Sequence, residues 1–493
     1  MTAETPSLAG RAALAVLLMV GFYLLALSIS VGLMAIPVAE YFAIHRVHFK
    51  LALVCVGGAL VILWSVLPRW DRFPPPGVPL REDEQPELFA VIRDVARAAG
   101  QAMPREVYLV PEVNAFVAQR GGLMGFFSRR VLGLGLPLLR TLDADQMRAV
   151  LAHEFGHFHG GDTKLGPWIY KTRSAIGRTL QALEGRGSAL RHPFRWYGNL
   201  FLRITHAISR AQEYAADRLA ARLVGAAPLR EGLMRLPALA TLYDVYLQRE
   251  LGPVLSAGRR PPYAEGYRLF LEHPEMVRAA EQITAEAAKQ TEPDPFDTHP
   301  PTPLRVQALA ALERSETAAS DRRPAWSWLR QAEALDEQVL AFLAGRERVA
   351  KLPRVAWSEV AEALWVPSWK AQFERWCALQ PNPLADLRLG ALPAAVAEAR
   401  TLGARCASAL ESEVPEEQHE DFGRYVLSAA LGLALHGAGF EASSPPGAPV
   451  TLRRGEHAFT PIEVVRELAA GTLDEASWRA RCEAAGVLEL ALA

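Results

Sequence analysis

The chain has 493 residues and a formal net charge of −1; half of its residues are apolar and 22% are charged. A chain of this length exceeds what one hydrophobic core normally supports, so two or three folded units are expected. The balanced charge argues against a nucleic-acid-binding protein, which would carry a basic excess. The cysteines are far apart and form no CxxC pair, which argues against a disulfide framework or a cysteine-based metal site.

Two apolar runs near the amino terminus predict a transmembrane hairpin. Ala12–Ala39 carries no charged side chain and, as a helix, exceeds a hydrocarbon core of roughly 30 Å. Pro37 is expected to mark its end. The second run, Leu51–Leu67, is near the lower limit for a span. A signal peptide is the alternative for the first run, but its uncharged stretch is too long for one and a second span follows closely.

Basic residues around this hairpin predict its orientation. The side that leads into the main body carries Arg11, Arg69, Arg72 and Arg81. The connecting loop carries Arg46 and Lys50. The positive-inside rule therefore places the main body in the cytoplasm, and a bacterial inner membrane is the expected location.

Beyond a proline-rich linker, the hydrophobic pattern alternates between helices and short strands. A helix is expected over 86–99, strands over 106–110, 114–118 and 130–139, and a further helix over about 201–223. Gly121 and Gly122 are expected to form the turn between the last two strands. Asp143 can cap the helix that follows, with Leu142 packing outside it. That helix runs into the sequence His153-Glu154-Phe155-Gly156-His157.

This HExxH sequence predicts a zinc site. Residues four apart on a helix share a face, so His153 and His157 can direct both imidazoles at one ion. Glu154 can then reach the water bound to that ion, which is the arrangement of a metalloprotease. Two hydrogen-bonded core histidines are the structural alternative. Gly156 adds weight to the metal site, because a glycine inside such a helix often indicates close approach of another element.

A third ligand is expected from the later helix. Glu213 and Asp217 lie four residues apart there, so their carboxylates share a face. One carboxylate can bind the metal, and the other can accept the free imidazole N–H of a ligand histidine. A solvated acidic face paired with Arg210 or Arg218 is the alternative.

Taken together, these motifs resemble the HtpX-like and CAAX-prenyl-endopeptidase family of membrane-linked gluzincins. The resemblance covers roughly residues 10–310. It is carried by the hydrophobic start, Asn114-Ala115-Phe116, His153 to Asp162 (HEFGHFHGGD), Ser209 to Asp217 (SRAQEYAAD), and Thr298-His299-Pro300 followed by Arg305. Members of this family often have further hydrophobic spans after the metal helix. Here that stretch, 163–210, is rich in Lys and Arg, and we do not expect it to span a bilayer.

The resemblance implies a role for each of these residues. It implies zinc ligation by His153, His157 and Glu213, with Glu154 as the general base. It implies that Asp217 supports a ligand histidine. It further implies that His299 and Arg305 stabilise the oxyanion, and that Asn114, Ala115 and Phe116 form the edge strand along which a peptide substrate lies.

The expected fold is therefore α+β and mainly helical: a zincin peptidase domain with a small antiparallel sheet, a transmembrane hairpin and a helical carboxy-terminal extension. The expected domains are the hairpin (1–72), a linker (73–80), the peptidase domain (81–314) and a helical region of unknown role (315–493). The expected activity is that of a membrane-anchored zinc metalloendopeptidase in membrane-protein or misfolded-protein quality control. Its expected partners are protein or peptide substrates and the lipid bilayer.

Two alternatives stay open on the sequence. The first is a membrane-tethered interaction protein with an inactive or autoinhibited peptidase domain, in which the carboxy-terminal region does the biological work. Zinc-dependent cleavage of an unfolded protein would distinguish the two. The second is a prenyl-protein processing enzyme, but that activity is associated with many more spans than this chain offers.

Overall fold

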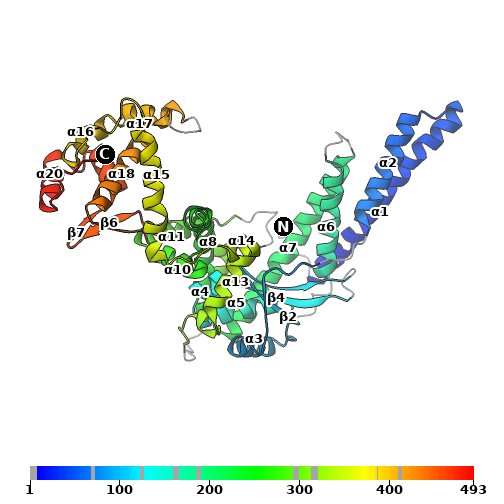
Figure 1. Cartoon of the computed structure of the whole chain (residues 1–493). Helices are drawn as coiled ribbons and strands as arrows, with labels where there is room; N and C mark the ends of the chain where they lie inside the picture. Colours follow the sequence, from blue (N-terminus) through cyan, green and yellow to red (C-terminus); the bar gives the residue numbers. More distant parts are fainter. Residues whose placement is uncertain are drawn as a thin grey trace. The chain divides into compact units, whose positions relative to one another are not determined.

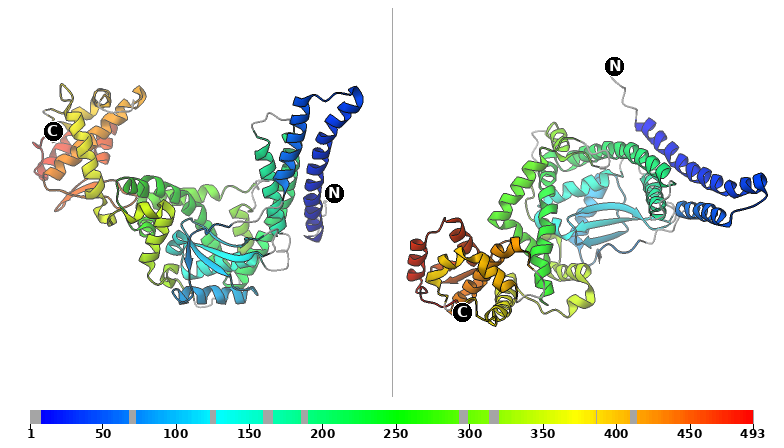
Figure 2. Two further views of the ribbon diagram at one scale, coloured as in Figure 1. Left: turned by 45° about the vertical axis from the view of Figure 1, so that its right-hand side comes forward. Right: turned by 90° about the horizontal axis from the view of Figure 1, so that it is seen from above.

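The computed structural model divides into two compact units (Figures 1 and 2). It describes residues 8–67, 73–122, 127–158, 166–184, 190–292, 299–312, 320–385, 387–408 and 414–492. The first unit comprises Met1–Leu239 and Glu281–Phe342, and the second comprises Ala240–Ala280 and Leu343–Ala493. The domain boundaries expected from the sequence stay a prediction. The fold class is as expected: mainly helical, with small sheets and two apolar helices at the amino-terminal end.

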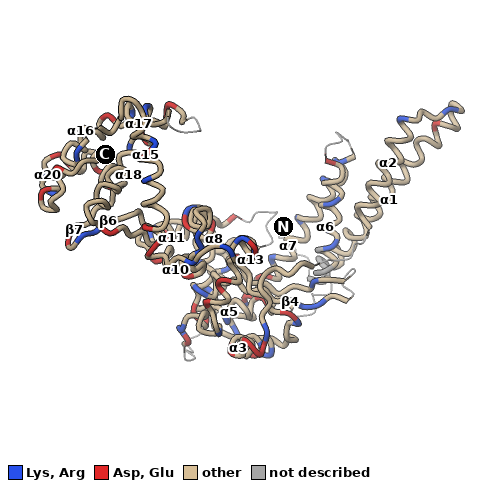
Figure 3. The backbone as a smooth tube through the Cα atoms, viewed as in Figure 1, with Lys and Arg blue, Asp and Glu red and all other residues tan. Residues whose placement is uncertain are grey.

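The two apolar helices are α1 (Leu8–Ile44) and α2 (Phe49–Val66), and both are long and apolar enough to cross a membrane. They pack against each other as a hairpin, and Figure 3 shows few charged residues along them. The expected end at Pro37 is wrong, because α1 continues through this proline to Ile44. A proline removes only one helical hydrogen bond, and in an apolar environment the remaining backbone groups still have to pair within the helix.

A second helical hairpin packs against the first. It consists of α6 (Gly166–Ala182) and the first half of α7 (Arg191–Leu223), so α7 begins ten residues before the expected helix. Its buried residues Ala175, Ile176, Leu183, Phe194 and Phe201 share one core with Leu18, Met19, Phe22, Ala26 and Ile62 of α1 and α2. The Tyr197 hydroxyl also donates to the Leu18 carbonyl at 2.7 Å. These contacts connect the apolar hairpin to the helix that carries Glu213.

The residues between α2 and α6 contain a four-stranded sheet. Its strands are β1 (Val78–Leu80), β2 (Glu106–Val110), β3 (Ala115–Arg120) and β4 (Arg129–Gly135), in the order β1-β2-β4-β3. The sheet is mixed rather than antiparallel, because the β3–β4 hairpin returns β4 parallel to β2. This order leaves β3 at one edge of the sheet.

The third strand is shorter than expected, because the chain turns into α4 (Leu136–Thr141) directly after Gly135. Pro137 lies in the first turn of α4, where a proline is tolerated, whereas inside a strand it would remove a ladder hydrogen bond. Gly135 itself cannot carry a side chain, because a Cβ atom there would lie 2.3 Å from the Glu112 carbonyl oxygen.

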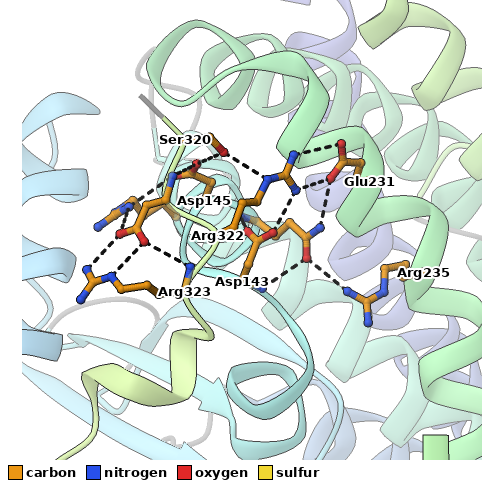
Figure 4. A network of polar contacts seen from close by, with 10 residues as sticks. Asp143, Asp145, Glu231, Arg235, Ser320, Arg322 and Arg323 are labelled. Carbon is orange, nitrogen blue, oxygen red and sulfur yellow. Dashed lines mark hydrogen bonds and ion pairs between the residues drawn. The ribbon is translucent and has the colours of Figure 1, made fainter. Parts of the chain in front are cut away.

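The metal-motif helix is α5 (Ala144–Gly156), and its start is fixed as the sequence predicts. The Asp143 side chain accepts from the Gln146 backbone N–H, and the Gln146 side chain accepts from the Asp143 N–H, which forms a capping box. Arg322 bridges Asp143 and Glu231, at 3.0 and 2.7 Å (Figure 4). The Asp321 backbone N–H donates to Asp145 at 2.7 Å. This network ties the start of α5 to α8 (Ala226–Tyr246) and to the segment that follows residue 319.

The remaining elements of the first unit are helical. They are α3 (Pro86–Ala98), the second half of α11 (Pro274–Ala287), α12 (Thr302–Ala310), the 3₁₀ turn η3 (Ala325–Trp328) and most of α13 (Ala332–Ala344). In α13 the side chains of Leu335 and Val339 are buried.

The second unit is mostly helical but contains a small sheet that the sequence did not predict. Its helical elements after α8 are η2 (Leu247–Leu251), α9 (Gly252–Ser256), α10 (Tyr263–Glu272), α14 (Arg346–Ala350), η4 (Trp357–Glu359), η5 (Ala361–Trp365), α15 (Val366–Cys377), η6 (Leu389–Ala391), α16 (Leu392–Ala397), α17 (Ala399–Ala407), η7 (Glu416–Gln418), α18 (His419–Gly437), α19 (Pro461–Ala470) and α20 (Glu475–Ala484). The antiparallel sheet consists of β5 (Glu441–Ser443), β6 (Thr451–Arg454) and β7 (His457–Phe459).

Candidate metal centre

The candidate site lies where α5 crosses α7. Gly156 of α5 lies directly against Ala216 of α7: a Cβ atom on Gly156 would be 2.9 Å from the Ala216 Cα and 3.0 Å from its Cβ. The close approach expected from this glycine is therefore confirmed, and α7 is the helix that approaches. Ala216 lies between Glu213 and Asp217 in the sequence, so the contact brings both carboxylates beside the HExxH motif.

The two histidines and Glu213 converge at this crossing. The His153 and His157 rings lie side by side, with centroids 4.7 Å apart. The Glu213 carboxylate faces both of them, with Oε2 at 3.4 Å from the His153 Nε2 and Oε1 at 3.5 Å from the His157 Nε2. Potential ligand atoms of His153, Glu154 and His157 all lie within 4.8 Å of one another. Imidazole nitrogen and carboxylate oxygen at such a centre are the ligands of a catalytic zinc site.

Asp217 and Arg305 support this group from behind. The Asp217 Oδ1 lies 2.9 Å from the His153 Nδ1, which leaves the His153 Nε2 directed at Glu213. Arg305 holds Asp217 with two parallel hydrogen bonds, from Nε at 2.8 Å and from a terminal nitrogen at 2.6 Å. All of these side chains are buried. A buried, bidentate Arg–Asp pair fixes the orientation of the carboxylate and, through it, of the histidine ring.

His299 also reaches the Glu213 carboxylate. Its Nδ1 lies 3.1 Å from the Glu213 Oε1, although its side chain is 58% exposed. Arg305, six residues later in α12, reaches the buried side of the same carboxylate, with a terminal nitrogen 3.4 Å from Oε2. The structure therefore brings both residues to Glu213. Whether either one also donates to an oxyanion stays a prediction, and both bonds from Arg305 to Asp217 fit a positioning role.

The edge strand β3 lies beside α5, and one of its backbone groups reaches the motif. The Val117 backbone N–H lies near the Glu154 carboxylate and lowers its pKa, against the larger effect of burial. This contact was not predicted, because a backbone donor leaves no sequence signature. It could have been suggested only by the expectation that this strand borders the cleft.

The residues expected to bind substrate lie at the start of this edge. Asn114 precedes β3 and is exposed, and its carbonyl accepts from the Gly135 N–H at 2.7 Å. Ala115 is buried. Phe116 packs with Tyr108 over the sheet, and its ring covers Gly133 so closely that a Cβ atom there would be 2.3 Å away. The Phe116 side chain thus packs against the sheet, and its backbone pairs with Gly133 of β4, so the backbone groups that face outward at this edge are those of Ala115 and Val117.

The protonation of the two histidines differs with their partners. Burial disfavours the charged form of His153, but its hydrogen bonds to Asp217 and Glu213 outweigh this effect and raise its pKa to about 9. Burial and the neighbouring His153 lower the pKa of His157 to about 4. His157 is therefore neutral near pH 7, with a nitrogen lone pair available to a metal ion.

The three carboxylates also differ. Burial opposes ionisation of Glu213 and Asp217, but hydrogen bonds from His153 to the first and from Arg305 to the second lower both pKa values. Burial raises the pKa of Glu154 above its usual range, which is the direction that suits a general base. The Glu213 Oε2 is buried, and its contacts with the His153 Nε2 and with an Arg305 terminal nitrogen, both at 3.4 Å, lack the geometry of a good hydrogen bond. A buried, ionised oxygen that is only weakly paired is costly, so a metal ion at this centre would fit the residues present.

Five motif positions lie outside the described residues. Positions 159 to 162, which end the HEFGHFHGGD motif with Asp162, lie in 159–165, and Thr298 lies in 293–298. Every other residue expected at the site is described.

Comparison with known proteins identifies a peptidase family over the part of the chain that contains this site. Residues 82–313 match peptidase family M48. The chain is 30% identical over 256 residues to the protease HtpX of Idiomarina loihiensis, covering 47% of this chain and 84% of that protein. It is 27% identical over 253 residues to a protease HtpX homolog of Pelotomaculum thermopropionicum, covering 48% of this chain and 78% of that protein. No solved structure matches.

Proposed function

The chain belongs to peptidase family M48, and on this premise we propose that it is a membrane-anchored zinc metalloendopeptidase acting in membrane-protein or misfolded-protein quality control. One observation carries the proposal: the carboxylate of Glu213 meets the imidazoles of His153 and His157 at 3.4 and 3.5 Å. These side chains come from two helices that are far apart in the sequence. Their convergence is what a three-ligand zinc site requires.

Zinc held by His153, His157 and Glu213 would supply a Lewis acid that polarises the scissile carbonyl and acidifies water. Glu154 takes the proton of the attacking water and then passes it to the leaving amine. The Val117 backbone N–H beside it favours its ionised form. We assign the largely exposed His299 to the oxyanion, where one donor is commonly worth about 3–4 kcal/mol.

In this proposal, Arg305 and Asp217 hold the metal ligand His153 in position. Asp217 accepts from the His153 Nδ1, and Arg305 holds Asp217 through two hydrogen bonds. Loss of either side chain would leave the charge of the other buried without this partner. It would also remove the contact that orients the His153 ring.

Substrates would bind as extended peptides along β3. This strand is an edge of the sheet and lies beside α5, so its outward backbone groups can pair with a peptide. Backbone pairing makes few demands on the side chains of the substrate. The hairpin α1–α2 would anchor this cleft at a membrane, which favours membrane proteins and exposed segments near the bilayer as substrates.

The direct test is cleavage of casein by detergent-solubilised protein, with and without a chelator. We expect cleavage that the chelator stops and that added zinc restores. Replacing Glu154 by Gln should reduce the rate by about 100-fold or more, because proton transfer is lost while the charge of the site changes little.

Wild-type cleavage rates in Glu154→Gln would contradict the proposed mechanism. The absence of zinc-dependent cleavage in the wild-type protein would favour the membrane-tethered interaction protein instead.

A further inference from the structure

A cavity of about 740 Å³ opens between α2 and α6, away from the metal centre. The wall from α2 is apolar and includes Leu60, Val61 and Trp64, whereas α6 contributes Arg178 and Gln181. Leu60 and Trp64 are 55% and 69% exposed. The cavity therefore combines an apolar helix surface with one cationic side chain.

The cation lies at one end of this apolar surface. The Arg178 Nε donates to the Ser65 carbonyl at 3.1 Å, and the Ser65 hydroxyl pairs with the Thr179 hydroxyl at 2.8 Å. Ser65 is in the last turn of α2, which ends at Val66, so Arg178 is fixed at the level where α2 would leave a bilayer. Leu60 lies more than one helical turn further along α2, toward the interior of the bilayer.

The hairpin that supplies Arg178 is basic. Its described basic residues are Lys171, Arg173, Arg178, Arg191, Arg195 and Arg203. Among the described residues 166–184 and 190–205, Glu184 is the only acidic one, and Arg191 pairs with it at 3.1 Å. Figure 3 shows blue bands along α6 and few charged bands along α2. A basic surface next to a membrane span attracts anionic headgroups.

We propose that this cavity binds an anionic phospholipid, with its phosphate on Arg178 and an acyl chain along Leu60, Val61 and Trp64. The inference rests on the proposed insertion of α1 and α2 into a membrane. At this depth a bilayer offers lipid chains rather than water to cover an apolar wall. A guanidinium at the headgroup level selects for a negative charge. The lipid would fill the space between α2 and α6, the hairpin that leads into the Glu213 helix.

The test measures lipid binding to the full-length protein in detergent by native mass spectrometry. Phosphatidylglycerol and phosphatidylcholine with the same acyl chains are added in separate titrations. We expect the first phosphatidylglycerol to bind about tenfold more tightly than phosphatidylcholine, and Arg178→Gln to remove that preference. Arg195→Gln is the matched control, because Arg195 is exposed on α7 and does not line the cavity.

A second variant tests the acyl-chain contact without changing charge. Val61→Trp fills the cavity, so it should weaken the binding of both lipids. Equal binding of the two lipids by the wild type, or an unchanged preference in Arg178→Gln, would overturn the proposal. Displacement of the lipid by inorganic phosphate at millimolar concentration would do so too, because it would indicate a simple anion site.

Membrane anchoring is tested separately by alkaline carbonate extraction of cell membranes. Protein that stays in the membrane but shows no lipid preference would overturn only the lipid site. Protein that is extracted would overturn the anchoring as well.

Discussion

Glu250 is a buried carboxyl group in the second unit, remote in sequence from the metal motif. Burial raises its pKa to about 7, opposed only in part by a hydrogen bond from the Gly447 N–H and by the charge of Arg249. The other charged groups that line the same small cavity are Glu275, Glu463 and Arg466. The folded protein therefore binds a proton at Glu250 between pH 4.5 and 7, where the unfolded chain does not.

This proton makes stability depend on pH. Because the folded state binds the extra proton, the stability of the wild type is greatest at about pH 4.5 for this group and falls as the pH rises toward 7. Glu250→Gln should remove that loss and raise stability at pH 8 by roughly 1–3 kcal/mol, with little change at pH 4.5. The melting temperatures of detergent-solubilised wild type and Glu250→Gln, at about pH 4.5 and about pH 8, measure this change in stability.

Glu275→Gln is the control, because this exposed neighbour lines the same cavity without being buried. If Glu250→Gln and Glu275→Gln showed the same pH dependence as the wild type, the raised pKa of Glu250 would be wrong.

At the residue scale, the sequence predicted those parts of the site that local geometry determines. The spacing of His153 and His157 follows from the helix period, and the cap at Asp143 follows from its capping-box partner. The proximity of Glu213 to these histidines depends on the packing of a helix that is distant in the sequence. It was expected only from the four-residue spacing of Glu213 and Asp217 and from the family resemblance. The donor at Val117 could not be predicted, since a backbone N–H is present at every residue except proline.

The crossing of α5 and α7 is the element-scale feature that assembles the site. At Gly156 the two backbones approach so closely that a methyl group would meet the Ala216 Cα at 2.9 Å. Gly156→Ala should therefore push α7 away and shift Glu213 relative to the histidines. A misplacement of a catalytic group by about 1 Å can cost about 100-fold in rate. We therefore expect the casein-cleavage rate to fall by about 100-fold.

Gly177→Ala provides the matched control for this substitution. Gly177 is also inside a helix, but nothing lies within 4 Å of a Cβ atom built there. This variant should keep full activity, because alanine favours a helix by up to about 1 kcal/mol over glycine. Equal activity in both variants would mean that the close contact at Gly156 does not position the site.

Sequence patterns located some of the other elements and missed others. Hydrophobic periodicity located β2, β3 and α5 closely, because each buries one regular face. It did not locate the packing of α6 on α1 and α2, because the basic residues of α6 masked its buried face of Ala175 and Ile176. It also extended β4 to residue 139, since an apolar run followed by a proline fits the end of a strand or the start of a helix.

At the scale of the whole molecule, the second unit joins distant parts of the chain. Tyr246 and Tyr267 are fully buried against each other, and Tyr246 also packs on Trp357. The Trp357 indole donates to the Pro262 carbonyl at 2.8 Å, and its ring lies against Gly266. Residues 240–280 thus share a core with residues beyond 343, although the sequence pattern gave no sign of this because long-range packing leaves no periodicity.

A truncation tests this shared core. A chain that ends at residue 342 would expose Tyr246 and Tyr267 to water, so we expect lower yield and aggregation on size-exclusion chromatography. Trp357→Phe keeps most of the apolar contact and should stay monodisperse. A truncated protein as stable and monodisperse as the full chain would contradict the shared core.

The proposed peptidase activity depends on one ion at the meeting point of His153, His157 and Glu213. The most direct measurement is the zinc content of purified wild-type, Glu154→Gln and Glu213→Ala proteins by elemental mass spectrometry. We predict about one zinc per chain in the first two and almost none in Glu213→Ala, because a third protein ligand is needed to hold the ion. A full complement of zinc in Glu213→Ala would contradict this account.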